Sequence, residues 1–470
     1  MTRITEMPAS GTPWEELRAE MVRRGEDDAR WREGRTAVYV FNAGEDVARV
    51  QQEAYALYMS ENGLGPLAFP SLKTMEEEVV GMGLWLLHGD ADCVGHMTSG
   101  GTDSITMAIK AARDFAREQR GLAGQGNLVV PYSAHPAFDK ACALMGLELR
   151  RVPVADDLRA DVAAMRRACD ERTVLVTGSA PSFPYGLIDP IAELGEMAQA
   201  AGVWLHVDAC VGGYIAPFVR RNGGDVPPFD FEVPGVCSIS ADLHKYGYCA
   251  KGASTVLFRS DEHRRHMVFD HRDWPGGRMI TPTLAGTRPG GAIAAAWAVM
   301  RYLGVDGYRR KHALVTAARE AIEAGVREMG FEVLGSPQLG IVAFAHPEVD
   351  ALALYRRMYH KGWFASFTTE PPALHLMLSP FHAEVTDDYL RELRAAPAEA
   401  EATTPKTWLW PVPAATSTRA RISRVSIRNP IRSCRCSILG RMCGASTLPC
   451  WTPSSRLEPP WDGLPYVCCR

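Results

Sequence analysis

Short apolar runs alternate with longer stretches of helical periodicity through the central part of the chain, between residues 64 and 304. Runs of four or five apolar residues predict buried strands, and apolar residues spaced three and four apart predict helices between them. This alternation is typical of a mostly parallel sheet covered by helices on both faces. The expected strands are 128–131, 174–177 and 203–207, and the expected helices are 137–145 and 191–201.

Both flanks of this region also carry periodic patterns. Thr12 and Pro13 precede a charged amphipathic segment, which predicts a helix with a capping box that runs to about Trp31. After residue 304 the pattern predicts a small α/β domain with helices at 305–329 and 349–361 and strands at 331–334, 341–345 and 374–378. We therefore expect an N-terminal helical segment (1–63), a large domain (64–304), a small domain (305–397) and an irregular tail (398–470).

The tail differs in composition from the rest of the chain. It holds ten Lys or Arg residues against four acids and six of the 12 cysteines, and it has no helical or strand period. Its mixture of Arg, Ser, Pro, Cys and Trp resembles a GC-rich gene read out of frame, so we hypothesise a frameshift near residues 393–397. The spacing of its cysteines fits no common zinc site, and we expect no metal.

Three separate segments carry candidate chemistry. Asp208 ends the expected strand 203–207, where a carboxylate is placed to pair with a protonated ring nitrogen; alternatively it only caps the next turn. Thr98-Ser-Gly-Gly-Thr102 opens an amphipathic helix, as a phosphate cradle or as a plain turn. Lys245 closes a β-rich run after His244, as an amine for a Schiff base or as an exposed loop residue. Phosphate cradle, acid and amine together predict pyridoxal phosphate.

Longer stretches around these segments resemble a known family. The chain looks like a member of the group II pyridoxal phosphate-dependent decarboxylase superfamily, and within it the sphingosine-1-phosphate lyase branch. The matching stretches span about residues 39–380 and are TSGGTDS (98–104), SAH (133–135), SAPSFPYGLID (179–189), HVDACVGG (206–213), SISADLHKYGYCAKGAS (238–254) and AGTRPGG (285–291). The resemblance implies an α/β fold of the aspartate-aminotransferase type, fold type I. Its large domain has a mostly parallel, seven-stranded-type sheet with helices on both faces, beside a small C-terminal α/β domain.

The resemblance also assigns roles in holding the cofactor. It implies that Lys245 bonds to the cofactor aldehyde beside His244, that Asp208 keeps the pyridine nitrogen protonated, and that His135 lies against the ring face. An ordinary loop histidine is the alternative for His135. Gly101 and Thr102 are expected to hold the cofactor phosphate. Thr287 is expected to reach that phosphate from the second subunit of a homodimer.

A second set of residues concerns the substrate. The family resemblance places Lys251, six residues after Lys245, and Asn62 at the substrate phosphate, and it gives Tyr39 a catalytic place; an exposed lysine and a packed tyrosine are the alternatives. Gly65 stands where the family has a phosphate-contacting histidine. That change removes a charge-assisted contact worth about 1.5–3 kcal/mol. The family's C-terminal Ala-Ile-Tyr-Gly segment has no match.

Composition excludes some classes of function and leaves three readings. A net charge of −4 gives no sign of nucleic-acid binding. No run of 18 apolar residues predicts a transmembrane segment, and no signal-peptide pattern opens the chain, so we expect a cytoplasmic protein. The expected activity is retro-aldol cleavage of a phosphorylated long-chain 2-amino alcohol to an aldehyde and phosphoethanolamine. The alternatives are an amino-acid decarboxylase and a catalytically impaired chain that still binds the cofactor.

Overall fold

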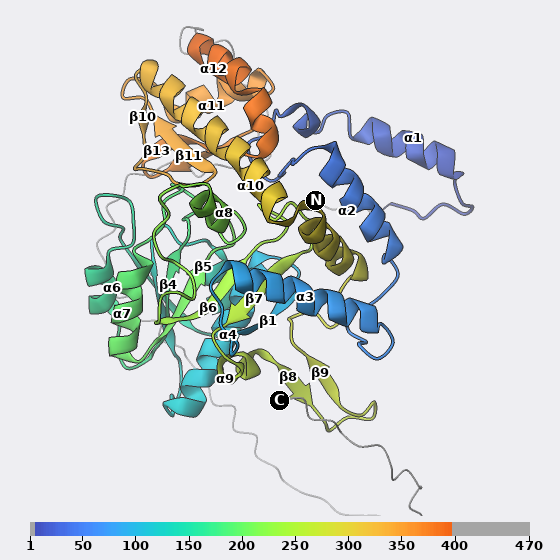
Figure 1. The fold of residues 1–470 in the computed structure, drawn as a ribbon, viewed down its shortest axis with the longest axis vertical. Coiled ribbons are helices and arrows are strands. Elements are labelled where there is room, and N and C mark those ends of the chain that lie inside the picture. The colour runs from blue at the N-terminus through green and yellow to red at the C-terminus, as the bar shows by residue number, and fades with distance from the viewer. Residues whose placement is uncertain (1–4, 397–470) are drawn as a thin grey trace, which may run out of the picture. The chain divides into compact units, whose positions relative to one another are not determined.

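The large domain is built on a seven-stranded sheet, shown in Figure 1 of the computed structural model, which describes residues 5–396. The strands are β1 (Val94–Thr98), β2 (Asn127–Pro131), β3 (Glu148–Val152), β4 (Thr173–Ser179), β5 (Trp204–Asp208), β6 (Val236–Ala241) and β7 (Ser254–Phe258). They are ordered β1-β7-β6-β5-β4-β2-β3. Five neighbouring strands of the sheet, β3, β2, β4, β5 and β6, run parallel to one another, whereas β7 is antiparallel to both of its neighbours. The mostly parallel sheet expected from the sequence is confirmed.

Burial on both faces explains why these strands read as continuous apolar runs. Every residue of β2, β4, β5 and β7 is buried, as expected when helices cover both faces of a parallel sheet. The surrounding helices are α3 (Pro70–Leu86), α4 (Gly101–Gln119), α5 (Ala137–Met145), α6 (Val162–Ala168), α7 (Ile191–Ala201), α8 (Ala216–Arg221) and α9 (Asp261–Arg264). Two separate clusters of buried side chains pack against the sheet, one of them around α4 and α5.

The small domain continues from a long helix. Helix α10 (Gly290–Glu328) begins earlier than the expected helix and kinks at Gly304, whose φ of 53° and ψ of −173° are not helical. The remaining elements are β10 (Glu332–Val333), β11 (Ile341–Ala345), α11 (Ala351–His360), β12 (Ser366–Thr369), β13 (Pro372–Met377) and α12 (Thr386–Ala395), with an antiparallel sheet ordered β10-β11-β13-β12. The sequence pattern missed β12 because its Ser-Phe-Thr-Thr run is short and three of its four residues are polar.

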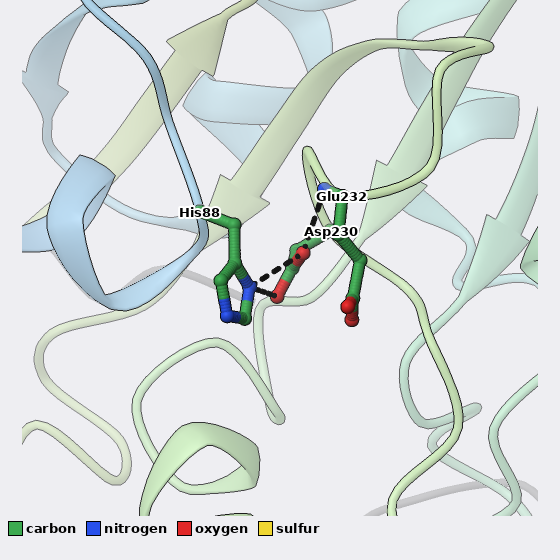
Figure 2. Close-up of side chains that lie close together, drawn as sticks. All are labelled: His88, Asp230 and Glu232. Carbon is green, nitrogen blue, oxygen red and sulfur yellow. Dashed lines mark hydrogen bonds and ion pairs between the residues drawn. The ribbon is translucent and has the colours of Figure 1, made fainter.

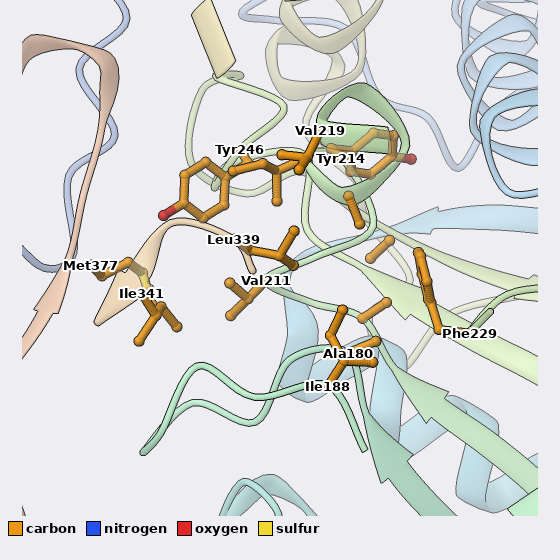
Figure 3. Close-up of a cluster of buried hydrophobic side chains, with 14 of the residues drawn as sticks. Ala180, Ile188, Val211, Tyr214, Val219, Phe229, Tyr246, Leu339, Ile341 and Met377 are labelled. Carbon is orange, nitrogen blue, oxygen red and sulfur yellow. The ribbon is translucent and has the colours of Figure 1, made fainter. Parts of the chain in front are cut away.

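One hydrophobic core joins the regions expected as the large and small domains, and the described residues all belong to one compact unit. Figure 3 shows Tyr246 of the large domain beside Leu339, Ile341 and Met377 of the small one, and all four side chains are buried. The Tyr246 hydroxyl donates a hydrogen bond of 2.8 Å to the carbonyl of Leu378, so the polar tip of this buried ring is satisfied. This packing fixes the small domain directly beside the segment that carries Lys245.

The N-terminal segment differs from its prediction in two ways. Helix α1 (Trp14–Arg24) ends before the expected Trp31, because Gly25 is followed by acidic residues that oppose the negative end of a helix. Pro13 is the N-cap and no side chain of the described residues caps the helix, so the capping box at Thr12 does not form.

The other elements are α2 (Glu45–Leu57), the hairpin β8 (Phe269–His271) with β9 (Met279–Thr281), and 3-10 turns at Trp31–Glu33, Arg265–Met267 and Pro380–Glu384. None of the helices between residues 5 and 396 combines the length and the apolar character that crossing a membrane requires. The tail, with its cysteines and the hypothesised frameshift, lies outside the described residues.

Candidate active site

A cavity of about 420 Å³ lies at the carboxyl ends of the central strands. In open parallel sheets this edge is where ligands bind, because the loops after the strands meet there. Six of the predicted site residues line the cavity: Gly101, Thr102, His135, Asp208, His244 and Lys245. The structure therefore brings into one site residues that are spread over 144 positions of the chain.

The start of α4 forms one wall of this cavity. Gly100 is the N-cap, and no side chain of the described residues caps the helix, so the first N–H groups of α4 are left for a ligand. A Cβ atom on Gly101 would lie 2.7 Å from the Cys210 sulfur and 2.9 Å from a carboxylate oxygen of Asp242. Only glycine fits this close approach. Free N–H groups at the positive end of a helix suit a phosphate.

Asp208 is held firmly at the end of β5. Its Oδ1 accepts a hydrogen bond of 3.1 Å from the backbone N–H of Cys210 and one of 3.4 Å from the Ser240 hydroxyl. The side chain is buried and lines the cavity. These contacts fix the orientation of the carboxylate and leave part of it open to the cavity. A carboxylate that pairs with the protonated nitrogen of a ligand needs both properties.

The two histidines of the cavity are oriented by the backbone. His135 Nδ1 accepts a hydrogen bond of 3.1 Å from the N–H of Ala137, which leaves the proton of the neutral ring on Nε2. His244 Nδ1 lies 2.8 Å from the carbonyl of Ala253, so it is the donor nitrogen there. Burial lowers the pKa of His244 below its usual value, which favours the neutral ring.

Lys245 has a partner that the sequence analysis missed. Its Nζ lies 3.0 Å from Oδ2 of Asp242, a carboxylate that is 2% exposed. The available signal was an acid three residues before the lysine, at the end of a buried strand. Two further cavity residues, Cys210 and Phe183, were also without a predicted role.

Tyr39 and Lys251 lie together, but outside this cavity. The Lys251 Nζ donates hydrogen bonds to the carbonyls of Tyr39, at 2.8 Å, and of His244, at 3.2 Å. Burial of the amine against Phe41 and the nearby charge of Lys245 lower the pKa of Lys251 to about 8. The Tyr39 ring is 68% exposed, and its backbone is left-handed with a φ of 65°. His244 lines both the cavity around Lys245 and a smaller one of about 150 Å³ that contains Lys251, so the two clusters adjoin.

Asn62 and Thr287 form a third group within the subunit. The Asn62 amide donates a hydrogen bond of 3.3 Å to the Thr287 hydroxyl, and its oxygen accepts one from the N–H of Arg288. Thr287 lines a cavity of only about 30 Å³ and is not among the residues that line the site around Lys245. Nearby, a Cβ atom on Gly65 would meet a single neighbour, Ala68, at 3.7 Å, which is ordinary contact. The backbone here leaves room for a side chain at position 65.

A second large cavity opens beside the first. It measures about 600 Å³ and shares His135 and Phe183 with the cavity around Lys245. Its walls combine aromatic side chains with Glu370, whose carboxylate accepts a hydrogen bond of 3.2 Å from the Tyr132 hydroxyl. A molecule held at Lys245 therefore has space to extend past His135.

Comparison with known proteins agrees with this geometry. Residues 31–346 match the family model described as the pyridoxal-dependent decarboxylase conserved domain. A sphingosine-1-phosphate lyase of Arabidopsis thaliana is 40% identical over 400 residues, which cover 83% of this chain and 73% of the relative. The chain belongs to the pyridoxal-dependent decarboxylase family. It is a pyridoxal phosphate-dependent lyase that is similar to the sphingosine-1-phosphate lyases.

Two further relatives refine this placement of the lyase. The solved structure of a sphingosine-1-phosphate lyase from Burkholderia pseudomallei K96243 superposes with a TM-score of 0.80 at 36% identity and covers 84% of this chain and 93% of that one. A probable L-tyrosine/L-aspartate decarboxylase of Methanothermobacter thermautotrophicus is 35% identical over 329 residues, 70% of this chain and 88% of the relative. The fold type I architecture and the cofactor are therefore as the sequence predicted.

The residues around the cavity fit pyridoxal phosphate. Lys245 offers an amine for the aldehyde, Asp208 offers a carboxylate for the ring nitrogen, and the uncapped start of α4 offers N–H groups for the phosphate. The close packing at Gly101 keeps a side chain out of this cradle. Each of the three chemical groups of the cofactor thus has a matching partner in one cavity.

One cluster in the lyase has the residue types of a metal site. Figure 2 shows His88, Asp230 and Glu232, whose ligand atoms lie within 4.8 Å of one another. His88 Nδ1 lies 3.0 Å from both oxygens of the buried Asp230, and Glu232 pairs with Arg220 at 2.9 Å. The side chains satisfy one another and tie the end of α3 to the loop before β6. We interpret the cluster as a structural tie.

Proposed function

We propose that this lyase cleaves the Cα–Cβ bond of a phosphorylated long-chain 2-amino alcohol, giving an aldehyde and phosphoethanolamine. The observation that carries the proposal is the position of Lys251, six residues after Lys245 and joined through the His244 carbonyl to the cofactor cavity. A cationic amine that adjoins the cavity around Lys245 suits a phosphate at the short end of the substrate. The adjoining cavity of about 600 Å³ supports room for the long end.

The residues of the cavity divide the work of the reaction. When bound, pyridoxal phosphate accepts the electron pair left on the α-carbon as a bond to that carbon breaks. Asp208, held by the Cys210 N–H, would keep a proton on the ring nitrogen and so favour that acceptance. The start of α4 would anchor the phosphate, and His135, which lines the same cavity, would limit movement of the ring on one face. Orientation then selects the bond that breaks, because the bond perpendicular to the ring is the one that is weakened.

The reaction as proposed balances without a further reactant. A base takes the proton of the hydroxyl group on Cβ, the Cα–Cβ bond breaks, and Cβ leaves as the aldehyde carbon. The electron pair that remains on Cα takes up one proton, so the amine half leaves as phosphoethanolamine. No oxidant or reductant is consumed.

Product analysis tests the proposal directly. Cofactor-loaded protein is incubated with sphingosine-1-phosphate, and the long-chain aldehyde and phosphoethanolamine are quantified together. Equal amounts of both products are expected. The same protein with L-tyrosine and L-aspartate gives the matched comparison, with carbon dioxide as the readout. Release of carbon dioxide without aldehyde would overturn the proposal.

Amino-acid decarboxylation is the second candidate, favoured by one observation. The archaeal decarboxylase relative is 35% identical over 88% of its own length. The same cofactor serves both reactions, so the choice depends on which group of the substrate is held perpendicular to the ring. An uncharged Lys251→Met variant separates the two candidates. Its loss of cleavage is expected to be confined to phosphorylated substrates, whereas a decarboxylase of unphosphorylated amino acids would be unaffected.

We also propose that the chain acts as a homodimer with shared sites. Helix α1 has no buried residue and exposes Trp14 and Met21, which suits packing on a second copy. Figure 1 shows this helix lying apart from the sheet. Thr287, expected at the cofactor phosphate, lines a different cavity of its own subunit. That cavity shares Ser99 and Asp103 with the cavity around Lys245, so the reach of Thr287 to a second subunit rests on the family resemblance alone.

Mixing inactive variants tests the shared site. Lys245→Ala and Thr287→Ala proteins are unfolded and refolded together, so that half of the dimers carry one of each subunit. In such a dimer one site has both an intact Lys245 and an intact Thr287 from its partner. Activity of about a quarter of the wild-type value is expected from random pairing, against little from either variant alone. No gain on mixing would contradict the shared site.

A cytoplasmic location remains part of the proposal. The thiols of the described residues are free and mostly buried, as is usual for proteins kept in a reducing compartment. Fractionation of the source cells, followed by detection of the chain in soluble and membrane fractions, tests it. Recovery in the membrane fraction after a high-salt wash would contradict it.

A further inference from the structure

Asp242 is an unusual carboxylate, because it is buried and only half of it has a partner. It follows β6 directly, is 2% exposed, and its Oδ2 lies 3.0 Å from the Lys245 Nζ. Its Oδ1 is buried and makes no hydrogen bond within the described part of the chain. Burying a charge costs several kcal/mol unless an opposite charge offsets it. Lys245 is the charge that does so here.

The position of this carboxylate is fixed from two sides. On the side of α4, the first residue of the helix approaches so closely that a Cβ on Gly101 would lie 2.9 Å from Oδ2 and 3.1 Å from Oδ1. On the side of its own loop, the backbone turns back on itself, and the N–H of Lys245 donates a hydrogen bond of 3.2 Å to the Asp242 carbonyl. Acid and amine are therefore held three residues apart on one rigid turn. The structure of the loop therefore fixes the ion pair between Asp242 and Lys245.

Other charged or titratable groups also surround the amine. These are Asp208 at the end of β5, Cys210 after that strand, His244 and Lys251 on the loop itself, Asp103 on α4, and His135 after β2. Burial alone would lower the pKa of Lys245. Asp242 in the first place, with Cys210 and Asp208, outweighs this and raises the pKa of Lys245 above its ordinary value. Burial opposes the ionisation of Asp242 too, yet Lys245 and then His244 hold its pKa below the usual value.

This pairing matters because only a neutral amine attacks an aldehyde. An ammonium ion paired with Asp242 has no free electron pair to offer. We propose that Asp242 is a positioning residue that holds Lys245 as an ammonium ion whenever its Nζ is not bonded to the cofactor. It thereby fixes the place of the amine and sets the pH range in which Lys245 can react. The inference rests on the cofactor chemistry of the family and not on the identity of the substrate.

The ion pair between Asp242 and Lys245 acts when the substrate amine replaces Lys245 on the cofactor. With Nζ carrying one proton in the bonded state, its bond to the cofactor carbon would break as that carbon bonds to the substrate nitrogen, and one proton would pass from that nitrogen to Nζ. Lys245 leaves as a neutral amine, and the extra proton of a substrate that entered as an ammonium ion converts it to its own ammonium form. Asp242 then holds this ion and prevents it from attacking the cofactor again. Charge and proton number in the site stay constant through the exchange.

Attachment of the cofactor to apoprotein tests the inference without any substrate. Wild-type and Asp242→Asn apoproteins are mixed with pyridoxal phosphate between pH 6.5 and pH 10, and bond formation is followed by absorbance. Borohydride reduction and peptide mass spectrometry verify attachment at Lys245. The wild-type rate is expected to rise about tenfold per pH unit without a plateau, because the neutral fraction grows with pH below the pKa of the amine.

The variant is expected to behave in the opposite way at neutral pH. Without the carboxylate, burial is left to lower the pKa of Lys245, so more of it is neutral at a given pH. At pH 7.5 attachment to Asp242→Asn is expected to be at least about tenfold faster than to wild type, with a plateau below pH 10. Asp242→Ser gives the same test if the asparagine variant folds poorly. Asp230→Asn, a buried aspartate outside the cavity, is the matched control and is expected to keep the wild-type profile.

A purely structural role of Asp242 predicts another result. Loss of a packing or hydrogen-bonding residue would slow attachment at every pH and leave the shape of the profile unchanged. Such a result, or profiles of wild type and both Asp242 variants that superimpose, would overturn the inference. A wild-type profile that reaches its plateau near pH 8 would also overturn it. Activity with sphingosine-1-phosphate is not needed for any of these outcomes, so a failure of the proposed substrate remains distinguishable.

Discussion

The cofactor cavity and the neighbouring Tyr39–Lys251 cluster differ in how they are held. Asp208 and Asp242 are both buried at the ends of adjacent parallel strands, and their partners lie within hydrogen-bonding distance on the same rigid framework. Tyr39 is largely exposed in a left-handed loop, and Lys251 contacts it only through its carbonyl. The residues that we propose for the cofactor lie at the ends of sheet strands, whereas those that we propose for the substrate phosphate lie on loops.

The same difference applies to Gly65, at which the family resemblance predicts a histidine. Gly65 lies among partly exposed loop residues, where a substitution disturbs no core packing. A change at Gly101 would instead drive a side chain into Cys210 and Asp242. The sheet-borne cavity therefore tolerates little change, and the loop-borne contacts can vary with the substrate. Variants in the two regions are expected to fail in different ways, the first in chemistry and the second in binding.

The largest effect is expected at Lys245. The Lys245→Ala variant loses the amine that bonds to the cofactor, so we expect activity to fall by at least about 10³-fold and the visible absorbance band of the bound cofactor to disappear. Lys245→Arg is the matched control, since it keeps a positive charge beside Asp242 but cannot form the bond. It is expected to be as inactive as the alanine variant. Substantial activity in either would mean that another residue holds the cofactor.

The next effect is expected at Asp208, in the same region. Asp208→Asn keeps the shape of the side chain but removes the charge that holds the proton on the ring nitrogen, so kcat is expected to fall by about 10²–10³-fold, equivalent to about 3–4 kcal/mol. KM is expected to change little. Ser240→Ala removes the contact of 3.4 Å to the carboxylate, together with the contacts of Ser240 to His206 and Cys210, but leaves Asp208 charged, so it serves as the control. A Ser240 variant as slow as Asp208→Asn would mean that position, and not charge, is decisive.

A smaller effect, confined to binding, is expected at Lys251. Its pKa of about 8 means that the amine is charged at pH 7 and loses its charge as the pH rises through 8. The KM for a phosphorylated substrate is therefore expected to rise above pH 8 in the wild type. Lys251→Arg stays charged and should show a flat profile, while Lys251→Met should raise KM by about 10–100-fold already at pH 7. An unphosphorylated analogue, whose KM should not respond to any of these changes, is the control.

The same contrast determines which parts of the fold and of the site could be predicted from the sequence alone. Helices α5 and α7 have the bounds that periodicity predicted, and Asp208 and Lys245 meet in one cavity because strand ends of a parallel sheet converge. The burial of Asp242 and its pairing with Lys245 could not be predicted, because an acid near a lysine is common on exposed loops. The contact of Asn62 with Thr287 joins residues 225 positions apart on two loops, which no local pattern encodes.

The smallest effect, and the sharpest test of the loop region, is expected at Gly65. A side chain there would meet only Ala68, so Gly65→His is expected to fold normally. If the phosphate of the substrate lies where the family resemblance places it, the new histidine adds a hydrogen bond, and KM for the phosphorylated substrate should fall by about tenfold with little change in kcat. Gly65→Ala, which fills the same space without a donor, is the control and should leave KM unchanged. An equal decrease in both variants would trace the gain to loop rigidity, and no decrease in either would mean that the substrate phosphate is bound elsewhere, on the side of Lys251 alone.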